Sequence, residues 1–467
     1  MLQRRGTVDP LRGSRPGGPE RVKHLAFVTV LAVYILEFST WFVTSTTLDF
    51  LLKGSCLITL AIMSVNHTRF SRRGWQLMWL YAAFFAIALV PNLRSAIGVL
   101  QYLKILGAFA TLPLILRTFE EKSDLSALLK CQVPIAIALS VQSLLLFWMI
   151  WVGSPPSEDL IHLGRNDVME RTFGIWGYAN ATVITGTDAM LRAQSWFLEP
   201  SVFALFLEFP VFITFGFYRL TGKVRYLLAF VVCTAGLIVT TSLAAFLSVM
   251  SALMFAAIWQ IVGRFRLART HLARNSITVI TAVVCVAASQ SLLDRLNEAY
   301  DPMATDRMAK VVGRDPTTQM LVRETDIVTF TIASITVSPL GSGLERTLGN
   351  RDDMASANAF LYWLQASGWP GVVALLFVYY FLFVEIAVPA LARRGLSRYV
   401  SMAFIAQTVH GLSAGNWMTP SYLVTVACLV LLTDRERGGG GTGPAPHRGY
   451  RPAVVGLRIA GQRGEGT

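Results

Sequence analysis

The stretch QSWFLEPSVFALFLEFPVFITFGFY, residues 194–218, decides the class of fold. After Glu199 and Pro200 it continues in apolar residues for the length of a helix that crosses a bilayer, which takes roughly 18 residues or more. Glu208 is the one charge inside this run. Hydrocarbon offers no water to backbone groups, so such a segment must form a helix with internal hydrogen bonds. The stretch therefore predicts a membrane-spanning helix that begins at Pro200.

The same apolar character extends over most of the chain. The 467 residues are 54% hydrophobic and 15% charged, whereas a soluble chain is about 25% charged. Apolar runs recur and predict about twelve spans of an all-α polytopic membrane protein, which excludes a soluble enzyme with one anchor. The predicted spans are 24–43, 47–65, 76–93, 96–116, 128–151, 200–218, 226–241, 242–262, 276–293, 369–390, 399–413 and 419–433.

The positive charge indicates topology. The net charge of +13 is spread over short loops and does not form one patch interleaved with aromatic residues, which argues against a nucleic-acid partner. If the N-terminus is cytoplasmic, the inner loops and both termini hold about two-thirds of the 41 lysines and arginines, as positive-inside bias requires. The pattern predicts cytoplasmic termini and an uncleaved signal anchor at the first span.

The chain divides into a membrane domain, 24–433, between two tails. Residues 1–23 are basic and residues 434–467 are rich in Gly, Pro and Arg, so both tails are expected to be disordered in the cytoplasm. The external loops are 152–199 and 294–357. One alternative remains open, since fusing the two spans within 226–262 into one long helix would invert part of the topology.

The external loops contain arginines that positive-inside bias does not require. The guanidinium fork grips phosphate with two parallel hydrogen bonds, so these arginines suit a phosphate or pyrophosphate group; the alternative is solvation or pairing with nearby carboxylates. The five cysteines all lie in apolar runs without metal-ligand spacing, and no metal or cofactor is expected. The external arginines are Arg165, Arg171, Arg192, Arg295, Arg307, Arg314, Arg323, Arg346 and Arg351.

Four segments carry a resemblance to one family. RAQSWFLEPSVFA (192–204) resembles the R-x-x-[GS]-x-F-x-E-P-S-x-x-A signature of the O-antigen polymerase and O-antigen ligase superfamily of bacterial membrane proteins. TTSLAAF (240–246) resembles its T-x-S segment, and SPLGSGLE (338–345) its P-x-G-x-G turn. NAFLYWLQASGWPG (358–371) resembles its N-x(9)-G-x-x-G segment. The order along the chain, with the largest external loop between the ninth and tenth spans, also matches the family over roughly residues 24–433.

The resemblance implies a membrane-embedded, GT-C-like glycosyltransferase that works without a metal in the bacterial cytoplasmic membrane. Its substrate would be a glycan linked to undecaprenyl pyrophosphate, and its active face would be periplasmic. Polymerases pass the glycan to another lipid-linked repeat unit, and ligases pass it to lipid A core. Further partners would be membrane lipids and a chain-length regulator or other polysaccharide export proteins.

One departure favours a polymerase of exopolysaccharide, capsule or O-antigen units. Ligases place a histidine directly before the asparagine of the N-x(9)-G-x-x-G segment, and here that position is Ala357, before Asn358. Among external positions only His162 remains, in the other loop. The ligase stays the alternative within the fold. A flippase of lipid-linked oligosaccharide is the alternative of another class, although the repeated halves expected of a transporter are not visible.

By match to the motifs, Arg192 and Arg323 are the candidate pyrophosphate-binding pair, with Arg346 as a third cation. Glu199 is the candidate to orient or deprotonate the acceptor hydroxyl, because an inverting transfer gains from a base near the nucleophile. An acidic residue before Pro200 also complements the helix dipole, so a purely structural role for Glu199 remains open. Further candidates for substrate contact are Asn358, Arg165 and Arg171.

The remaining motif residues are expected to be structural. Pro200 and Ser201 suit the first turn of a helix. Gly341 and Gly343 are expected to permit a tight turn, and Gly368 and Gly371 to allow close packing where a helix enters the membrane. Charges in or beside the spans are compatible with a polar groove: Glu37, Asp49, Lys53, Lys104, Lys130, Glu208 and Glu385.

Overall fold

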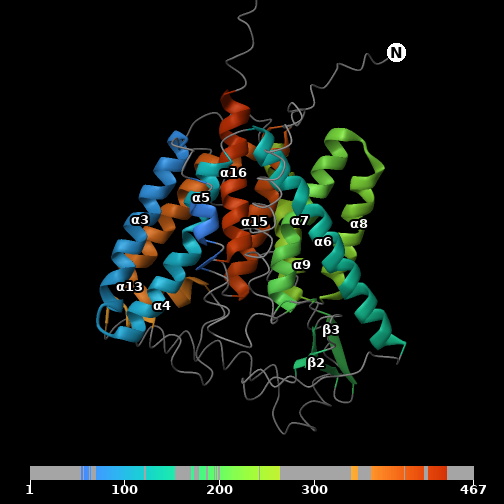
Figure 1. Cartoon of the computed structure of the whole chain (residues 1–467), viewed down its shortest axis with the longest axis horizontal. Coiled ribbons are helices and arrows are strands. Elements are labelled where there is room, and N and C mark those ends of the chain that lie inside the picture. The colour runs from blue at the N-terminus through green and yellow to red at the C-terminus, as the bar shows by residue number, and fades with distance from the viewer. Residues whose placement is uncertain are drawn as a thin grey trace, which may run out of the picture.

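The structure is a computed structural model of the chain (Figure 1). It describes residues 54–64 without 56 and 63, then 70–119, 122–152, 170–172, 178–185, 188–193, 195, 197, 200–240, 242–262, 338–344, 359–393, 395–414 and 419–438.

Helices long and apolar enough to cross a membrane dominate the described part, which confirms a helical membrane protein. The described residues contain six such helices, and Val224–Val239 is a shorter apolar helix. The predicted spans 24–43 and 276–293 lie outside the described residues, so the count of twelve stays a prediction. The six are Arg72–Asn92, Gly98–Thr118, Leu125–Met149, Ser201–Thr221, Ala244–Ile261 and Leu361–Leu391.

The helical passages run alternately up and down the bundle. Figure 1 shows α3 at one side and α8 at the other, with α15 and α16 between them. The elements, in chain order, are α3 (Arg72–Asn92), α4 (Ala96–Phe109), α5 (Thr111–Thr118), α6 (Lys122–Trp151), α7 (Pro200–Thr221), α8 (Val224–Val239), α9 (Leu243–Val262), α13 (Ala359–Tyr380), the π-helix η5 (Phe381–Ala387), α14 (Val388–Leu391), α15 (Leu396–Ala414) and α16 (Pro420–Gly438).

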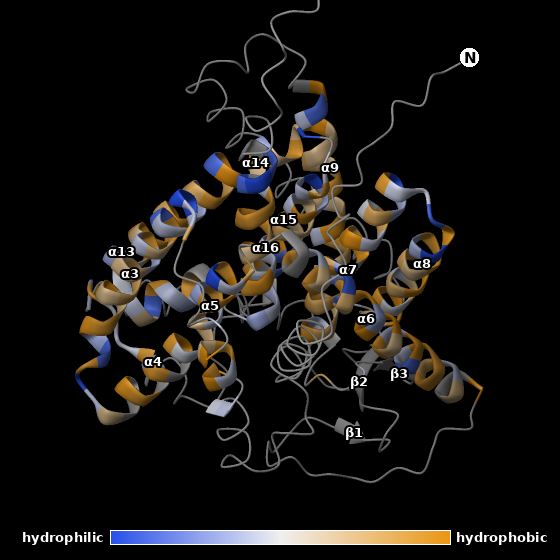
Figure 2. Ribbon diagram, turned by 45° about the horizontal axis from the view of Figure 1, so that its top comes forward, coloured by the Kyte–Doolittle hydropathy of each residue, from blue (hydrophilic) through white to orange (hydrophobic). Residues whose placement is uncertain are grey.

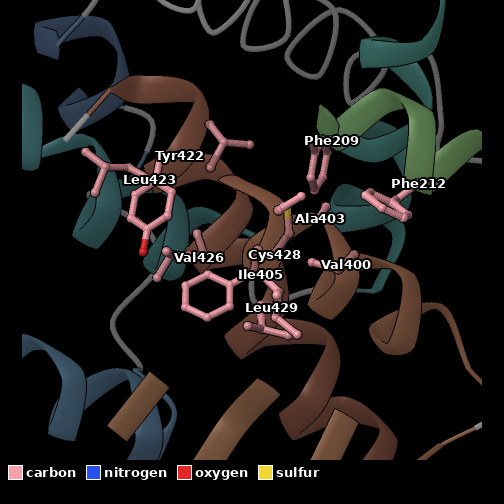
Figure 3. Close-up of a cluster of buried hydrophobic side chains, with 14 of the residues drawn as sticks. Phe209, Phe212, Val400, Ala403, Ile405, Tyr422, Leu423, Val426, Cys428 and Leu429 are labelled. Carbon is pink, nitrogen blue, oxygen red and sulfur yellow. The ribbon is translucent and has the colours of Figure 1, made fainter. Parts of the chain in front are cut away.

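The central helices α15 and α16 are buried by their neighbours. α15 packs against α7, α9 and α16, and α16 also packs against α5. Phe404 of α15 and Tyr422 of α16 are fully buried, and their ring centroids lie 5.9 Å apart. Tyr422 belongs to the cluster of buried side chains in Figure 3. Hydrophobic residues spread along the outer helices α4, α6 and α8 (Figure 2). Because α15 and α16 are shielded from lipid, they can carry more polar residues than an isolated span could.

The two helices within 226–262 are separate. α8 ends at Val239 and α9 begins at Leu243, with Thr240 and Ser242 between them. α8 packs against α6 and α7, whereas α9 packs mainly against α15. The alternative of one long helix is therefore wrong, because the two segments have different packing partners.

A small sheet modifies the all-α expectation for the loop 152–199. β1 (Glu170–Thr172), β2 (Tyr178–Thr185) and β3 (Asp188–Ala193) form an antiparallel sheet in the order β1-β2-β3. The strand β2 is rich in β-branched residues and alternates in polarity only weakly, so the loop showed no clear strand pattern. We call the end of the bundle next to this sheet, where α3 ends and α7 begins, the sheet end (Figure 1).

At the opposite end, which we call the basic end, α16 runs past the predicted start of the tail at 434. Asp434 forms an ion pair with Arg73 of α3 at 2.8 Å. Glu436 accepts hydrogen bonds from the backbone N–H and the hydroxyl of Ser397, at 3.2 and 2.5 Å. α16 thus extends to Gly438, a few residues past the predicted start of the tail, and these polar contacts lie along its last turns.

Candidate functional site

The sheet places two of the candidate arginines at the sheet end. Arg192 of β3 lies opposite Asn180, which in turn lies opposite Glu170. Arg171 of β1 lies opposite Ala179, in the adjacent row. β3 packs against the last part of α6 (Figure 1). Two arginines from separate parts of the loop are therefore held by one small sheet beside the bundle.

Ser195 connects this sheet to the membrane helices. Its backbone has a φ of 52°, the one positive φ among the described non-glycine residues. Its hydroxyl donates a hydrogen bond to Oε1 of Gln142 on α6, at 2.7 Å, and its side chain is buried. The left-handed conformation favours glycine, and a hydroxyl that finds a partner can offset its cost. This gives a physical reason for Gly or Ser at this position of the R-x-x-[GS] pattern.

Phe197 anchors the segment onto the start of α7. Its side chain is 1% exposed, and its ring centroid lies 5.2 Å from that of Phe203 and 5.3 Å from that of Phe206. A buried aromatic residue that precedes a helix and packs on its first turns fixes the direction in which the chain enters the helix. The fixed phenylalanine of the pattern is thus a packing anchor.

Pro200 is the first residue of α7, and Ser201 is half-buried in its first turn. Proline suits this position, because its missing N–H has no partner at a helix start and its φ is already helical. Glu199 lies outside the described residues, so its role as a base remains a prediction.

The turn 338–344 docks against a break in α13. Gly368 has a φ of 66° inside this helix, and its neighbour Trp369 donates its backbone N–H to the Pro339 carbonyl at 3.1 Å. From the other side, the N–H groups of Ser342 and Gly343 donate to the carbonyls of Gln365 and Ala366, at 2.9 and 3.1 Å. The turn therefore satisfies backbone groups that the break in the helix leaves without intrahelical partners.

The four motif glycines meet in this unit. Gly341 and Gly343 have φ values of 91° and 86°, which favour glycine. A side chain on Gly341 would lie 2.6 Å from the backbone nitrogen of Gly368, and one on Gly368 would overlap the Pro339 carbonyl. A side chain on Gly371 would overlap the hydroxyl of Ser367. Gly341 and Gly368, far apart in sequence, thus permit one close backbone contact, whereas Gly371 leaves room for a side chain of its own helix.

Asn92 links the turn to α3. Its Oδ1 accepts the N–H of Leu344 at 2.7 Å, and its Nδ2 donates to the Ala88 carbonyl at the same distance. Its side chain is 1% exposed, so both groups are satisfied within the protein. The sequence analysis missed Asn92; an amide at the end of an apolar span was the available signal.

A buried polar cluster lies beneath the start of α7. Oε1 of Glu208 accepts the hydroxyl of Ser248 of α9 at 2.5 Å and contacts Nδ1 of His410 of α15 at 2.6 Å. All three side chains are 0% exposed. One turn away, Nε2 of Gln407 donates to the Leu205 carbonyl at 2.9 Å. Glu208 was expected as an intramembrane charge, whereas its partner His410 was missed, although a histidine in an apolar run is a visible signal.

Several candidates lie outside the described residues, so the structure neither joins nor separates them. The other intramembrane charges divide in the same way: Glu37, Asp49 and Lys53 lie outside, Lys130 is exposed on α6, and Glu385 is half-buried in η5. Within the described residues no group of His, Cys, Asp and Glu could hold a metal ion. The candidates outside the described part are Arg165, Glu199, Arg323, Arg346 and Asn358.

No protein family matches the chain in a scan of its sequence, and no curated protein matches it significantly. The resemblance to the O-antigen polymerase and ligase superfamily therefore rests on the four segments and on where they lie in the fold.

Proposed function

We propose that this chain is a polysaccharide polymerase that extends repeat units linked to undecaprenyl pyrophosphate, in exopolysaccharide, capsule or O-antigen synthesis. One observation carries the proposal. The described parts of all four motif-like segments lie at the sheet end, where the sheet holds Arg171 and Arg192. These parts are the approach to α7, the break between α8 and α9, the turn 338–344 and the start of α13 (Figure 1).

The distribution of charge supports a periplasmic position for this end. The basic end collects most of the described arginines and lysines, and positive-inside bias assigns such an end to the cytoplasm. The sheet end has few, and these include Arg171 and Arg192. The residues at the basic end are Arg72, Arg73, Arg117, Arg219, Lys223, Arg225, Arg393, Arg398 and Arg435.

The proposed reaction is an inverting glycosyl transfer. The acceptor hydroxyl of one repeat unit attacks the anomeric carbon of the growing chain, the bond to the pyrophosphate oxygen breaks, and undecaprenyl pyrophosphate leaves. Arg192 and Arg323, with Arg346 as a third cation, would stabilise the charge on the leaving pyrophosphate, a role that arginine fills without a metal. Glu199 would take the proton of the acceptor hydroxyl. Arg165, Arg171 and Asn358 would contact the substrate.

Sizing lipid-linked glycans in cells separates the candidate functions. The gene is deleted and then restored as wild type, Arg192→Ala or Arg323→Ala, with membrane insertion checked for each variant. A polymerase predicts single lipid-linked repeat units in the deletion strain and in both variants. Long undecaprenyl-linked chains that never reach their acceptor would instead indicate a ligase. Units trapped on the cytoplasmic face would indicate a flippase, and wild-type chain lengths in both variants would overturn the site.

A further inference from the structure

The cluster of Glu208, Ser248 and His410 lies in the membrane interior and has no part in the proposed reaction. Glu208 is eight residues beyond Pro200, about 12 Å deeper along the helix at 1.5 Å per residue. α7 is the most deeply buried of the six spans. In its most apolar stretch 83% of the residues are buried, and in none of the other spans does this share exceed 56%. A carboxylate in such surroundings is rare and usually has a specific partner.

Pro210 interrupts the backbone hydrogen bonds of α7 and divides the helix into two halves. A proline has no N–H, so the hydrogen bond that residue 210 would donate to the Phe206 carbonyl is absent. The half beyond Pro210 packs closely on α15, where a side chain on Gly216 would lie 2.7 Å from the ring of Tyr399. It also packs on α8 through Phe217 and Tyr226, whose ring centroids are 5.0 Å apart.

The half before Pro210 is buried among apolar side chains, such as Phe203 and Phe206 packed on Phe197. It is also held to neighbouring helices by polar contacts. The described contacts are the bonds of Glu208 to Ser248 and His410 and the bond of Gln407 to the Leu205 carbonyl. Gln407 and His410 are one turn apart on α15, as Leu205 and Glu208 are on α7. α15 therefore contacts two successive turns of α7. These turns lie between Pro210 and the segment that leads back to Arg192.

We propose that Glu208, Ser248 and His410 are positioning residues, which hold the first half of α7 against α9 and α15 and thereby fix the place of the Arg192 segment. The effect of these residues on catalysis rests on the proposed function, whereas their role in holding α7 in place does not. With the proton of His410 on Nδ1, Oε1 of Glu208 accepts from both His410 and Ser248, so the role requires an acceptor at this atom and not a negative charge.

Labelling of a cysteine at the start of α7 tests the structural content without any substrate. Val202 is the second residue after Pro200, and its side chain is 7% exposed. Val202→Cys therefore provides a buried thiol. In that background Glu208→Leu removes the acceptor without leaving an unpaired charge, and Glu208→Gln keeps an oxygen at Oε1. Thr214→Val is the matched control, because Thr214 is 0% exposed and its hydroxyl bonds only carbonyls of its own helix, those of Pro210 and Val211.

A membrane-impermeant maleimide is expected to label the introduced thiol at position 202 roughly tenfold to a hundredfold faster in the Glu208→Leu protein, the factor expected for losing two buried hydrogen bonds. Rates in the Glu208→Gln and Thr214→Val proteins are expected to stay within about twofold of the parent. The parent without Val202→Cys corrects for native cysteines. Equal rates in the Glu208→Leu and Thr214→Val proteins would overturn the proposal, as would fast labelling of the Glu208→Gln protein.

If Glu208→Leu fails to insert, the double variant Glu208→Gln/His410→Leu replaces it. Its glutamine still accepts the Ser248 hydroxyl, but the contact between residue 208 and residue 410 of α15 is lost, so fast labelling is expected and parental labelling would contradict the proposal. Turnover of lipid-linked repeat units by the purified Glu208→Leu protein is expected to fall roughly tenfold to a hundredfold. Turnover at the wild-type rate with faster labelling would overturn the catalytic consequence, whereas no turnover by the wild type would reject the proposed function and leave the labelling result valid.

Discussion

At the scale of single residues, the positive φ at Gly368 matters because of what lies beside it. Gly222 has almost the same φ, 67° against 66° for Gly368. The ψ of Gly368, −169°, lies in a region that is essentially restricted to glycine. A side chain on Gly222 would meet nothing within 4 Å, whereas one on Gly368 would overlap the carbonyl of Pro339. The pair therefore compares a positive φ in open space with a positive φ inside a close backbone contact.

Gly368→Ala is expected to lower the stability of the protein by about 3 kcal/mol or more, because strain and overpacking add. Gly222→Ala, the control, is expected to cost about 1 kcal/mol, from strain alone. The measurement is thermal unfolding of the purified protein in detergent. Equal losses in the two variants would show that the turn 338–344 does not dock against α13.

At the scale of elements, the start of α15 depends on the end of α16. Oε1 and Oε2 of Glu436 accept the N–H and hydroxyl of Ser397 in the first turn of α15, where a negative charge also complements the helix dipole. Arg393, just before α15, donates to the Thr433 carbonyl at 2.7 Å. Gly395 permits this approach, since a side chain there would overlap Glu436.

Glu436→Ala is therefore expected to lower stability by about 1 to 2 kcal/mol, as the loss of a partly exposed charged acceptor predicts. It is also expected to increase proteolysis between α14 and α15. Glu385→Ala, a change of another half-buried glutamate in the same region, provides the comparison for protease sensitivity. Unchanged cleavage at residues 392–396 in the Glu436→Ala protein would contradict a role for Glu436 in holding α15.

The sequence predicted the helices well where one long apolar run forms the whole span, as for α3, α6 and α7. It predicted less where tertiary contacts decide. The start of α13 at Ala359, ten residues before the predicted span, depends on the turn that docks at Gly368. The sheet of the first external loop depends on pairing between segments of weak pattern. His410 became a candidate only through its contact with Glu208, because sequence alone does not bring α7 and α15 together.

At the scale of the whole molecule, we expect the sheet end of the bundle on the periplasmic side of the membrane and the basic end on the cytoplasmic side. Single cysteines at Lys223, between α7 and α8, and at Leu340, in the docked turn, test this assignment. Both parent side chains are exposed. A membrane-impermeant thiol reagent added to intact spheroplasts is expected to label position 340 and to reach position 223 only after lysis. The reverse pattern would invert the topology and place Arg192 in the cytoplasm.

We propose that the protein polymerises glycans from lipid-linked repeat units at its sheet end. Reconstitution of the purified protein is the most direct test of this activity. Purified protein in liposomes is given repeat units on undecaprenyl pyrophosphate, without added metal, and both chain length and released undecaprenyl pyrophosphate are measured. We expect chains of several units, one released lipid pyrophosphate per bond formed, and a loss of roughly a hundredfold or more in the Arg192→Ala protein. Repeat units that stay single with the wild-type protein, or full activity after Arg192→Ala, would contradict the proposal.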